Sequence, residues 1–221
     1  MSQYEPGLQT KNRILSACRE LFYEKGYDNT TFVDIARAAS VNQGSIYYHF
    51  TSKEKLLSII MDETILKNDS IINMYSDDDI LFYSRYFIGG KLYLYKMYND
   101  EKYRRFNLDA THLLNAENYH QLMELVMLQE RVAEDAPLIK RFEGMANMSF
   151  DVITRIFFVN EMEKYTVEEI HSAQIEIFRR ILKIDDDQFK AIQVQIDRID
   201  SMVPWEKLDT TLDPERLFIE G

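Results

Sequence analysis

The sequence predicts an all-α protein, and two observations carry this prediction. Only seven glycines and four prolines occur in 221 residues, which leaves few positions where helices must end. Apolar residues recur at helical spacing along the chain, and no stretch shows the alternation typical of a strand. We expect a three-helix domain over residues 1–52, a larger helical domain over residues 53–203 and an irregular tail over residues 204–221.

The first helix is predicted over residues 10–25. Ile14, Cys18 and Leu21 recur at the spacing that places side chains on one face of a helix. Gly26 follows, and glycine commonly ends helices because it adopts the left-handed conformation without strain.

Two short helices follow, joined by a tight turn. Thr31 can cap the first of them, residues 32–39, and Asp34 completes a capping-box pattern three residues later. Asn42 can cap the second, which runs to Phe50. Two short helices with such a turn form a helix-turn-helix, a motif that enters the major groove of DNA.

The larger domain is predicted to contain seven helices. The helix over residues 80–98 is apolar almost all round, which is typical of a helix at the centre of a domain. Pro137 favours the first turn of another, and Thr166 with Glu169 forms a second capping-box pattern. The predicted ranges are 53 to the low 70s, 80–98, 101–114, 117–133, 137–161, 166–184 and 186–202.

The charge of the chain is unevenly distributed. The first 56 residues carry seven Lys and Arg against six Asp and Glu, whereas the remainder carries 19 against 31. Phosphate would repel such an acidic body, which therefore favours an orientation with the near-neutral N-terminal end towards DNA.

Several classes of protein are not expected from this sequence. No apolar run is long enough to span a membrane, and the first residues resemble no signal peptide, so we expect a cytoplasmic protein without a membrane partner. The single Cys18 allows no internal disulfide. We find no zinc-ligand cysteine set, P-loop or nucleophile elbow, and therefore expect no enzyme, no catalytic or metal-binding residue and no cofactor.

The second short helix has the composition of a recognition helix. Its exposed face must fit a groove about 12 Å wide, which favours compact hydrogen-bonding side chains. Ile46 and Phe50 are expected to face inward, and Gly44 would let the helix approach DNA closely. The polar and aromatic residues left for the groove are Asn42, Gln43, Ser45, Tyr47, Tyr48 and His49.

This segment resembles the TetR family of transcriptional regulators. The resemblance lies in residues 30–36 (TTFVDIA), 41–50 (VNQGSIYYHF) and 52–57 (SKEKLL). It implies that Thr31 touches the DNA backbone and that Lys53 binds a phosphate. Phe32 departs from the family pattern, in which that position is often basic or polar. The candidate DNA-binding residues are Thr31, Asn42, Gln43, Gly44, Ser45, Tyr47, Tyr48, His49 and Lys53.

The resemblance also implies a homodimer formed by two long helices near the end of the chain. The apolar residues of the predicted helix 166–184 span about 200°, twice the arc that one packing partner needs. Such a helix could contact both its own domain and a second subunit, or lie between two helices of one subunit. The candidate interface residues are Phe150, Ile153, Phe157, Ile170, Gln174, Ile177, Phe178 and Ile181.

Members of the family often hold a small-molecule effector in the larger domain. Aromatic and methionine side chains with a few polar groups would suit an apolar or aromatic effector, although such residues also commonly form an ordinary core. The candidate lining residues are Tyr83, Tyr86, Phe87, Tyr93, His112, His120, Met123 and Met127.

The family resemblance alone favours repression as the mechanism. A dimer would place two recognition helices about 34–36 Å apart, in successive major grooves of an inverted repeat. An effector that fits only the non-binding arrangement would then release the DNA.

Two other classes of function compete with this interpretation. Glu117-x-x-His120 and Glu168-x-x-His171 have the spacing found in di-iron helical bundles, but such a site needs two further glutamates that the sequence does not identify. A DNA-organising or protein-interaction protein with the same fold and no small ligand is the second alternative.

Overall fold

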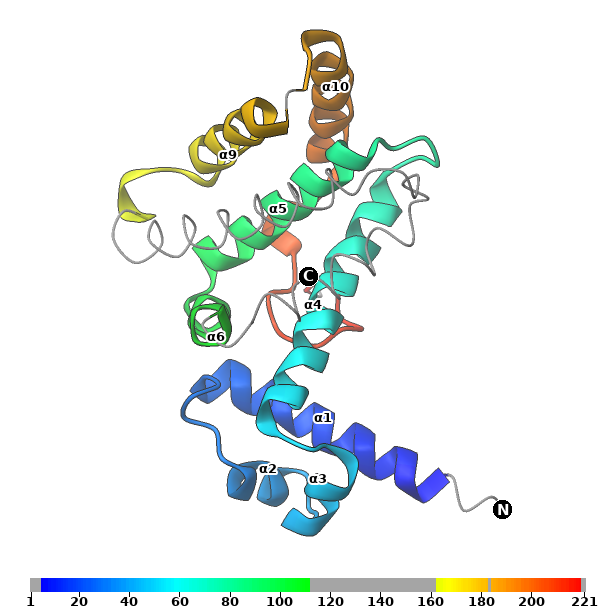
Figure 1. The fold of residues 1–221 in the computed structure, drawn as a ribbon, viewed down its shortest axis with the longest axis vertical. Coiled ribbons are helices and arrows are strands. Elements are labelled where there is room, and N and C mark those ends of the chain that lie inside the picture. The colour runs from blue at the N-terminus through cyan, green and yellow to red at the C-terminus, as the bar shows by residue number, and fades with distance from the viewer. Residues whose placement is uncertain (1–4, 112–161, 183, 220–221) are drawn as a thin grey trace. The chain divides into compact units, whose positions relative to one another are not determined.

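The computed structural model describes residues 5–111, 162–182 and 184–219 (Figure 1). The prediction of an all-α fold is confirmed, and the only β-type pairing among the described residues is one isolated bridge. The predicted helices 117–133 and 137–161 lie outside the described residues. The helices are α1 (Glu5–Lys25), α2 (Phe32–Ala38), α3 (Gln43–His49), α4 (Lys53–Tyr75), α5 (Phe82–Asn99), α6 (Glu101–Thr111), α9 (Val167–Leu182) and α10 (Asp186–Met202), with single 3-10 turns η1 (Met162–Lys164) and η2 (Trp205–Lys207).

The chain forms two compact units whose boundary differs from the predicted one at residue 52. The first unit comprises residues 1–67, 100–114 and 207–221, and the second comprises residues 68–99 and 115–206. The difference arises because α4 is a single helix of 23 residues that contributes to both units. No described helix is both long enough and apolar enough to cross a membrane.

The core of the first unit is built around α1. Figure 1 shows α2 and α3 on one side of this helix and α6 on the other. Ile14, Cys18 and Phe22 are fully buried, as their spacing predicts. The Phe22 ring stacks on Phe106 of α6 at 6.2 Å between centroids and meets the edge of Tyr27 at 5.2 Å. The first unit therefore needs α6 as well as the first three helices to complete its core.

Helix α1 starts five residues earlier than predicted and ends where predicted. Pro6 falls in its first turn, where the missing N–H removes no helical hydrogen bond. Gly26 ends the helix with φ +84° and donates its N–H to Phe22 O at 3.0 Å. A Cβ at this position would lie 2.6 Å from the Asp109 Oδ2 atom, so both the backbone conformation and the space favour glycine.

The tail has little regular secondary structure, as predicted, but it is fixed in the first unit. Leu208 and Phe218 form the isolated antiparallel bridge, and Asp209 N donates to Leu217 O at 2.9 Å. The Lys67 ammonium of α4 donates to Asp209 Oδ1 at 2.7 Å, and only 1% and 2% of the two side chains are exposed. A buried ion pair thus joins α4 to the tail.

In the second unit, α9 and α10 both pack against α5. The central position predicted for α5 is confirmed, although its buried face includes two lysines. Lys91 pairs with Asp200 of α10 at 2.5 Å, and the fully buried Lys96 donates to Asn68 Oδ1 at 2.7 Å. Sequence periodicity did not indicate these lysines, because their polar partners lie on distant parts of the chain.

Candidate nucleic-acid interface

Helix α2 begins with the predicted capping box. Thr31 Oγ1 accepts a hydrogen bond from Asp34 N at 3.2 Å, and Asp34 Oδ2 accepts one from Thr31 N at 3.1 Å. The hydrogen bonds from Thr31 hold the pKa of the Asp34 carboxyl below its usual value. Thr31 is exposed at the start of the helix, in the place predicted from the sequence.

The turn between α2 and α3 has a fixed geometry. Ser40 adopts φ +51° and donates its N–H to Arg37 O at 3.2 Å. The next residue, Val41, donates its N–H to Ala36 O at 3.0 Å. This pair of bonds is a Schellman motif, which satisfies two carbonyls at the end of α2. The motif sets the direction in which α3 leaves the turn.

Helix α3 is fixed by its cap and by two buried residues. Asn42 Oδ1 accepts from Ser45 N at 2.8 Å and from Ser45 Oγ at 3.1 Å, so the predicted N-cap is confirmed. Ile46 and Phe50 are buried, with 0% and 2% exposure. A Cβ on Gly44 would lie 3.1 Å from the Asn42 cap oxygen, so a larger residue there would crowd the cap.

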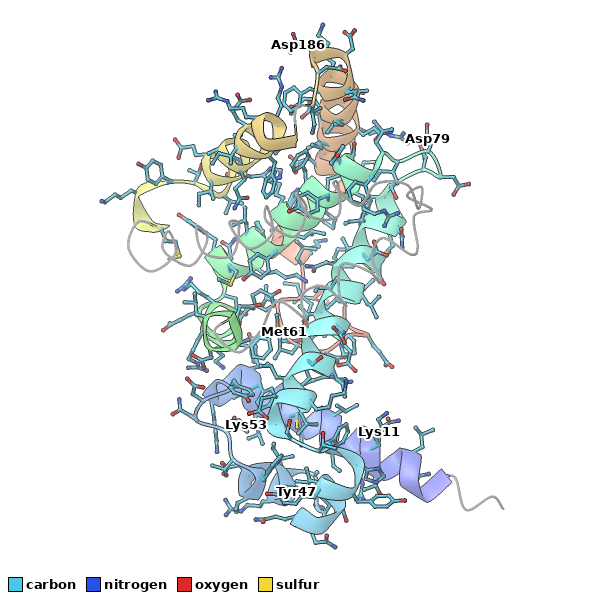
Figure 2. The ribbon with its side chains drawn as sticks, in the orientation of Figure 1. Lys11, Tyr47, Lys53, Met61, Asp79 and Asp186 are labelled. Carbon is cyan, nitrogen blue, oxygen red and sulfur yellow. The ribbon has the colours of Figure 1, made fainter. Side chains whose placement is uncertain are left out.

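The outer face of α3 presents aromatic and polar groups to solvent. Tyr47 is 55% exposed and Tyr48 is 84% exposed, and Gln43 is also exposed (Figure 2). The Tyr47 ring rests edge-on against Phe32 of α2, with 4.9 Å between centroids. Phe32, the residue that departs from the family pattern, therefore orients a residue of the recognition helix.

Comparisons with known proteins find a match over the residues that form this helix-turn-helix. Residues 14–59 match the family model described as "Bacterial regulatory proteins, tetR family". This segment of the chain is therefore similar to the DNA-binding segment of TetR-family regulators. The matched segment covers α1 from Ile14 onward, the helix-turn-helix and the start of α4.

Curated relatives described as HTH-type regulators resemble part of this chain. A probable HTH-type transcriptional regulator, ArpR of Pseudomonas putida, is 32% identical over 77 residues, which are 35% of this chain and 37% of that protein. IcaR of Staphylococcus aureus strain Newman, a negative transcriptional regulator of a biofilm operon, is 46% identical over 46 residues, or 21% of this chain and 25% of IcaR. The chain thus matches about a third or less of the length of these curated relatives.

A solved TetR-family structure shows a similar fold over most of the chain. A regulator from Streptomyces coelicolor A3 aligns with 83% of this chain and 99% of its own length, with a TM-score of 0.53 and 15% identity. The similarity therefore extends beyond the DNA-binding segment, at the level of the fold.

Lys53, at the start of α4, has a different environment from the one expected. Its ammonium donates to Tyr27 O at 2.9 Å and to Thr30 O at 3.0 Å, and it lies 4.0 Å from the centroid of the Tyr27 ring. These contacts fix the connection between α1 and α2. Two of the three N–H groups of this lysine donate to backbone carbonyls inside the protein. One N–H group is left for the phosphate contact expected from the family resemblance.

Part of the predicted effector-binding set forms one aromatic cluster. The Tyr86 ring lies 5.7 Å from Phe87, and Phe178 of α9 lies 5.4 Å from Tyr86 and 6.3 Å from Phe87. Tyr83 stacks on Phe87 at 6.5 Å, and Tyr93 lies further along the same helix, α5. His112, His120, Met123 and Met127 lie outside the described residues.

The predicted dimer residues of α9 fall on two faces. Ile170 and Phe178 are buried at 8% and 4% exposure, and Phe178 contacts α5 of its own chain, so both are reassigned to the core of the second unit. Ile177 is 42% exposed and stays available to a second subunit, while Gln174 is buried. Phe150, Ile153, Phe157 and the Ile181 side chain lie outside the described residues.

The described Glu-x-x-His pair, Glu168 and His171, does not support the di-iron alternative. The His171 ring is buried and its Nε2 lies 2.8 Å from Phe87 O, while the exposed Glu168 side chain lies 4.0 Å from the Lys91 ammonium. Nowhere in the described ranges do three or more His, Cys, Asp or Glu side chains gather as a metal site would require. Glu117 and His120 lie outside these ranges.

Proposed function

We propose that the protein is a sequence-specific transcriptional repressor that binds an inverted-repeat operator as a homodimer in the cytoplasm. The observation that carries this proposal is the outward face of α3, where Tyr47 and Tyr48 stand exposed while Ile46 is fully buried beneath them. The match of residues 14–59 to the TetR family model supports it, as does the negative regulation stated for IcaR.

The geometry of α3 suits the major groove. Gln43 and Gly44 occupy its exposed first turn, so a base edge could reach the Gln43 amide without a bulky neighbour. Ser45 and Asn42 already share a cap hydrogen bond, which favours a positioning role for them over direct base readout. Tyrosine hydroxyls commonly hold phosphates, and Tyr48 is the most exposed of these candidates.

The homodimer is proposed to use the exposed face of α9. Ala173 and Ile177 lie one turn apart on this helix and both face solvent. A second copy packed there would bury them, and the pair of recognition helices could then contact two half-sites about 34–36 Å apart.

Sequence selection from random duplex DNA tests the function as a whole. We expect the purified protein to enrich an inverted repeat, and Tyr48→Ala to fold normally but bind that repeat at least about tenfold more weakly, because it loses one hydrogen bond to a charged phosphate. Circular dichroism would verify the fold of the variant. Enrichment of no sequence by a folded dimer, or full affinity in Tyr48→Ala, would contradict the proposal.

The effector is proposed to be a small apolar or aromatic molecule bound by the second unit. Besides the Tyr86, Phe87 and Phe178 cluster, α9 carries Gln174 one turn before Phe178. The Gln174 Oε1 atom is buried without a hydrogen-bond partner in the described structure. An unpaired buried acceptor costs stability, and a ligand that donates a hydrogen bond would recover it.

Gln174→Leu is expected to stabilise the free protein by about 1 kcal/mol, because it removes the unpaired buried oxygen at similar volume. Urea denaturation without added ligands would measure the change. Gln193→Leu on α10 is the matched control, since that side chain is bonded to Asp197 near the surface and should change stability by less than about 0.5 kcal/mol. A destabilised Gln174→Leu protein would mean that the amide has a structural partner and no ligand role.

A further inference from the structure

The positive charges of the first 56 residues divide into two groups. Arg19 forms a two-point ion pair with Glu63 at 2.7 and 2.8 Å, and Lys25 pairs with Asp34 at 3.4 Å. Lys53 donates to two backbone carbonyls. The cations that are exposed and have no ion pair or hydrogen bond among the described residues are Lys11, Arg13, Arg37 and Lys55.

One of these four cations lies beside the recognition helix. A Cβ on Gly7 would lie 4.0 Å from His49 Cε1, so the first turns of α1 pass close to the end of α3. Lys11 follows Gly7 by four residues and therefore lies on the same face of α1, one turn further along. Figure 2 shows Lys11 on the N-terminal half of α1, in the same unit as Tyr47 of α3. Arg13 is rotated well away from this face.

We infer that Lys11 of α1 binds a DNA phosphate next to the groove that α3 enters, and that Lys53 does not. This inference rests on the proposed function and names one of its contacts. The Lys11 ammonium is exposed and uncommitted, so binding a phosphate breaks no protein contact. For Lys53, reaching a phosphate would mean giving up hydrogen bonds to Tyr27 O or Thr30 O and the contact with the Tyr27 ring.

The dependence of DNA affinity on salt separates these two lysines. Each phosphate contact releases counterions and adds about 0.9 to the slope of log K against log salt. We expect Lys11→Gln to reduce this slope by about one and to weaken binding similarly on every sequence. Lys53→Met should leave the slope unchanged and instead lower the urea midpoint, because it loses the carbonyl contacts.

The experiment uses fluorescence anisotropy with a labelled duplex of mixed sequence and a second duplex carrying the selected repeat. Lys102→Gln is the matched control, an exposed lysine of the same unit that is paired with Glu24 at 2.6 Å, and its slope should equal that of the wild type. A full slope in Lys11→Gln, or a reduced slope in Lys53→Met, overturns the inference while the proposed function stands. If the wild type binds neither duplex in a salt-dependent way, the proposed function fails and the inference fails with it.

Discussion

Replacing Asp209 with alanine is expected to lower the free energy of unfolding by about 3–5 kcal/mol, the usual cost of removing one partner from a buried ion pair. Asp209 Oδ1 accepts from Lys67 and from the backbone and hydroxyl of Thr211, and Oδ2 lies 3.2 Å from Arg216 Nε. Burial alone would raise the pKa of this carboxyl, but the bonds from Lys67 and Thr211 outweigh burial and hold the pKa below its usual value. The alanine variant would leave the buried Lys67 ammonium without its carboxylate, with the bond to Thr211 O as its remaining described contact.

The double variant Lys67→Met with Asp209→Leu separates the contribution of the charges to stability from that of side-chain packing. It removes both charges and keeps apolar volume, so it should recover most of the stability that Asp209→Ala loses. Urea denaturation followed by circular dichroism would give the three free energies, with hydrogen exchange reporting on α4. A loss of less than about 1 kcal/mol in Asp209→Ala would show that the tail is not held by this pair.

Acidification is expected to destabilise the second unit through His171. Desolvation lowers the pKa of this buried imidazole to about 4 from its ordinary 6.5, against the smaller opposing effect of its hydrogen bond with Phe87 O. A carbonyl only accepts, so Nε2 carries the proton of the neutral ring. Lys91, which also faces the ring, lowers the pKa further, while Asp200 and Glu168 raise it.

The direction in which pH changes the stability follows from which state, folded or unfolded, binds the proton at His171. Between pH 6.5 and pH 4 the unfolded chain binds a proton at His171 that the folded chain does not, so stability falls as the pH falls through this window. The slope approaches about 1.4 kcal/mol per pH unit, and the whole window amounts to about 3 kcal/mol. Above pH 6.5 the contribution of this group is constant.

His171→Gln isolates this contribution, because a glutamine amide can still donate to Phe87 O but does not titrate. The stability of the variant should vary less between pH 7 and pH 4.5 than that of the wild type, by about 2–3 kcal/mol. Parallel curves for the two proteins would contradict a depressed pKa at this site.

The features that the sequence predicted well are local ones. The caps at Thr31 and Asn42 were predictable because each depends on a partner three residues away. The inward positions of Ile46 and Phe50 were predictable because residues four apart lie on one face of a helix. Such contacts form within one or two turns of a helix, where spacing alone determines geometry.

Features that depend on distant residues were not predictable in this way. Lys53 bonds to carbonyls 23 and 26 positions earlier, and Lys67 pairs with a residue 142 positions later. Nothing in the periodicity of either helix indicates such partners. The early start of α1 was also missed, because Pro6 and Gly7 suggest a turn unless the space beside His49 is known.

The composite make-up of the first unit has a consequence for protein engineering. A chimeric regulator could be made by joining the N-terminal DNA-binding segment to a foreign sensor domain, with a junction near residue 52, as the sequence predicts, or after residue 67, where the first stretch of the first unit ends. Either junction would remove Phe106 from the Phe22 ring and expose an apolar surface. A junction after residue 67 would also remove Asp209 from Lys67 and leave a buried charge without its partner. A chimera that keeps the DNA-binding unit intact must include α6 and residues 207–219. The foreign sensor domain therefore has to be inserted as two separate segments of chain.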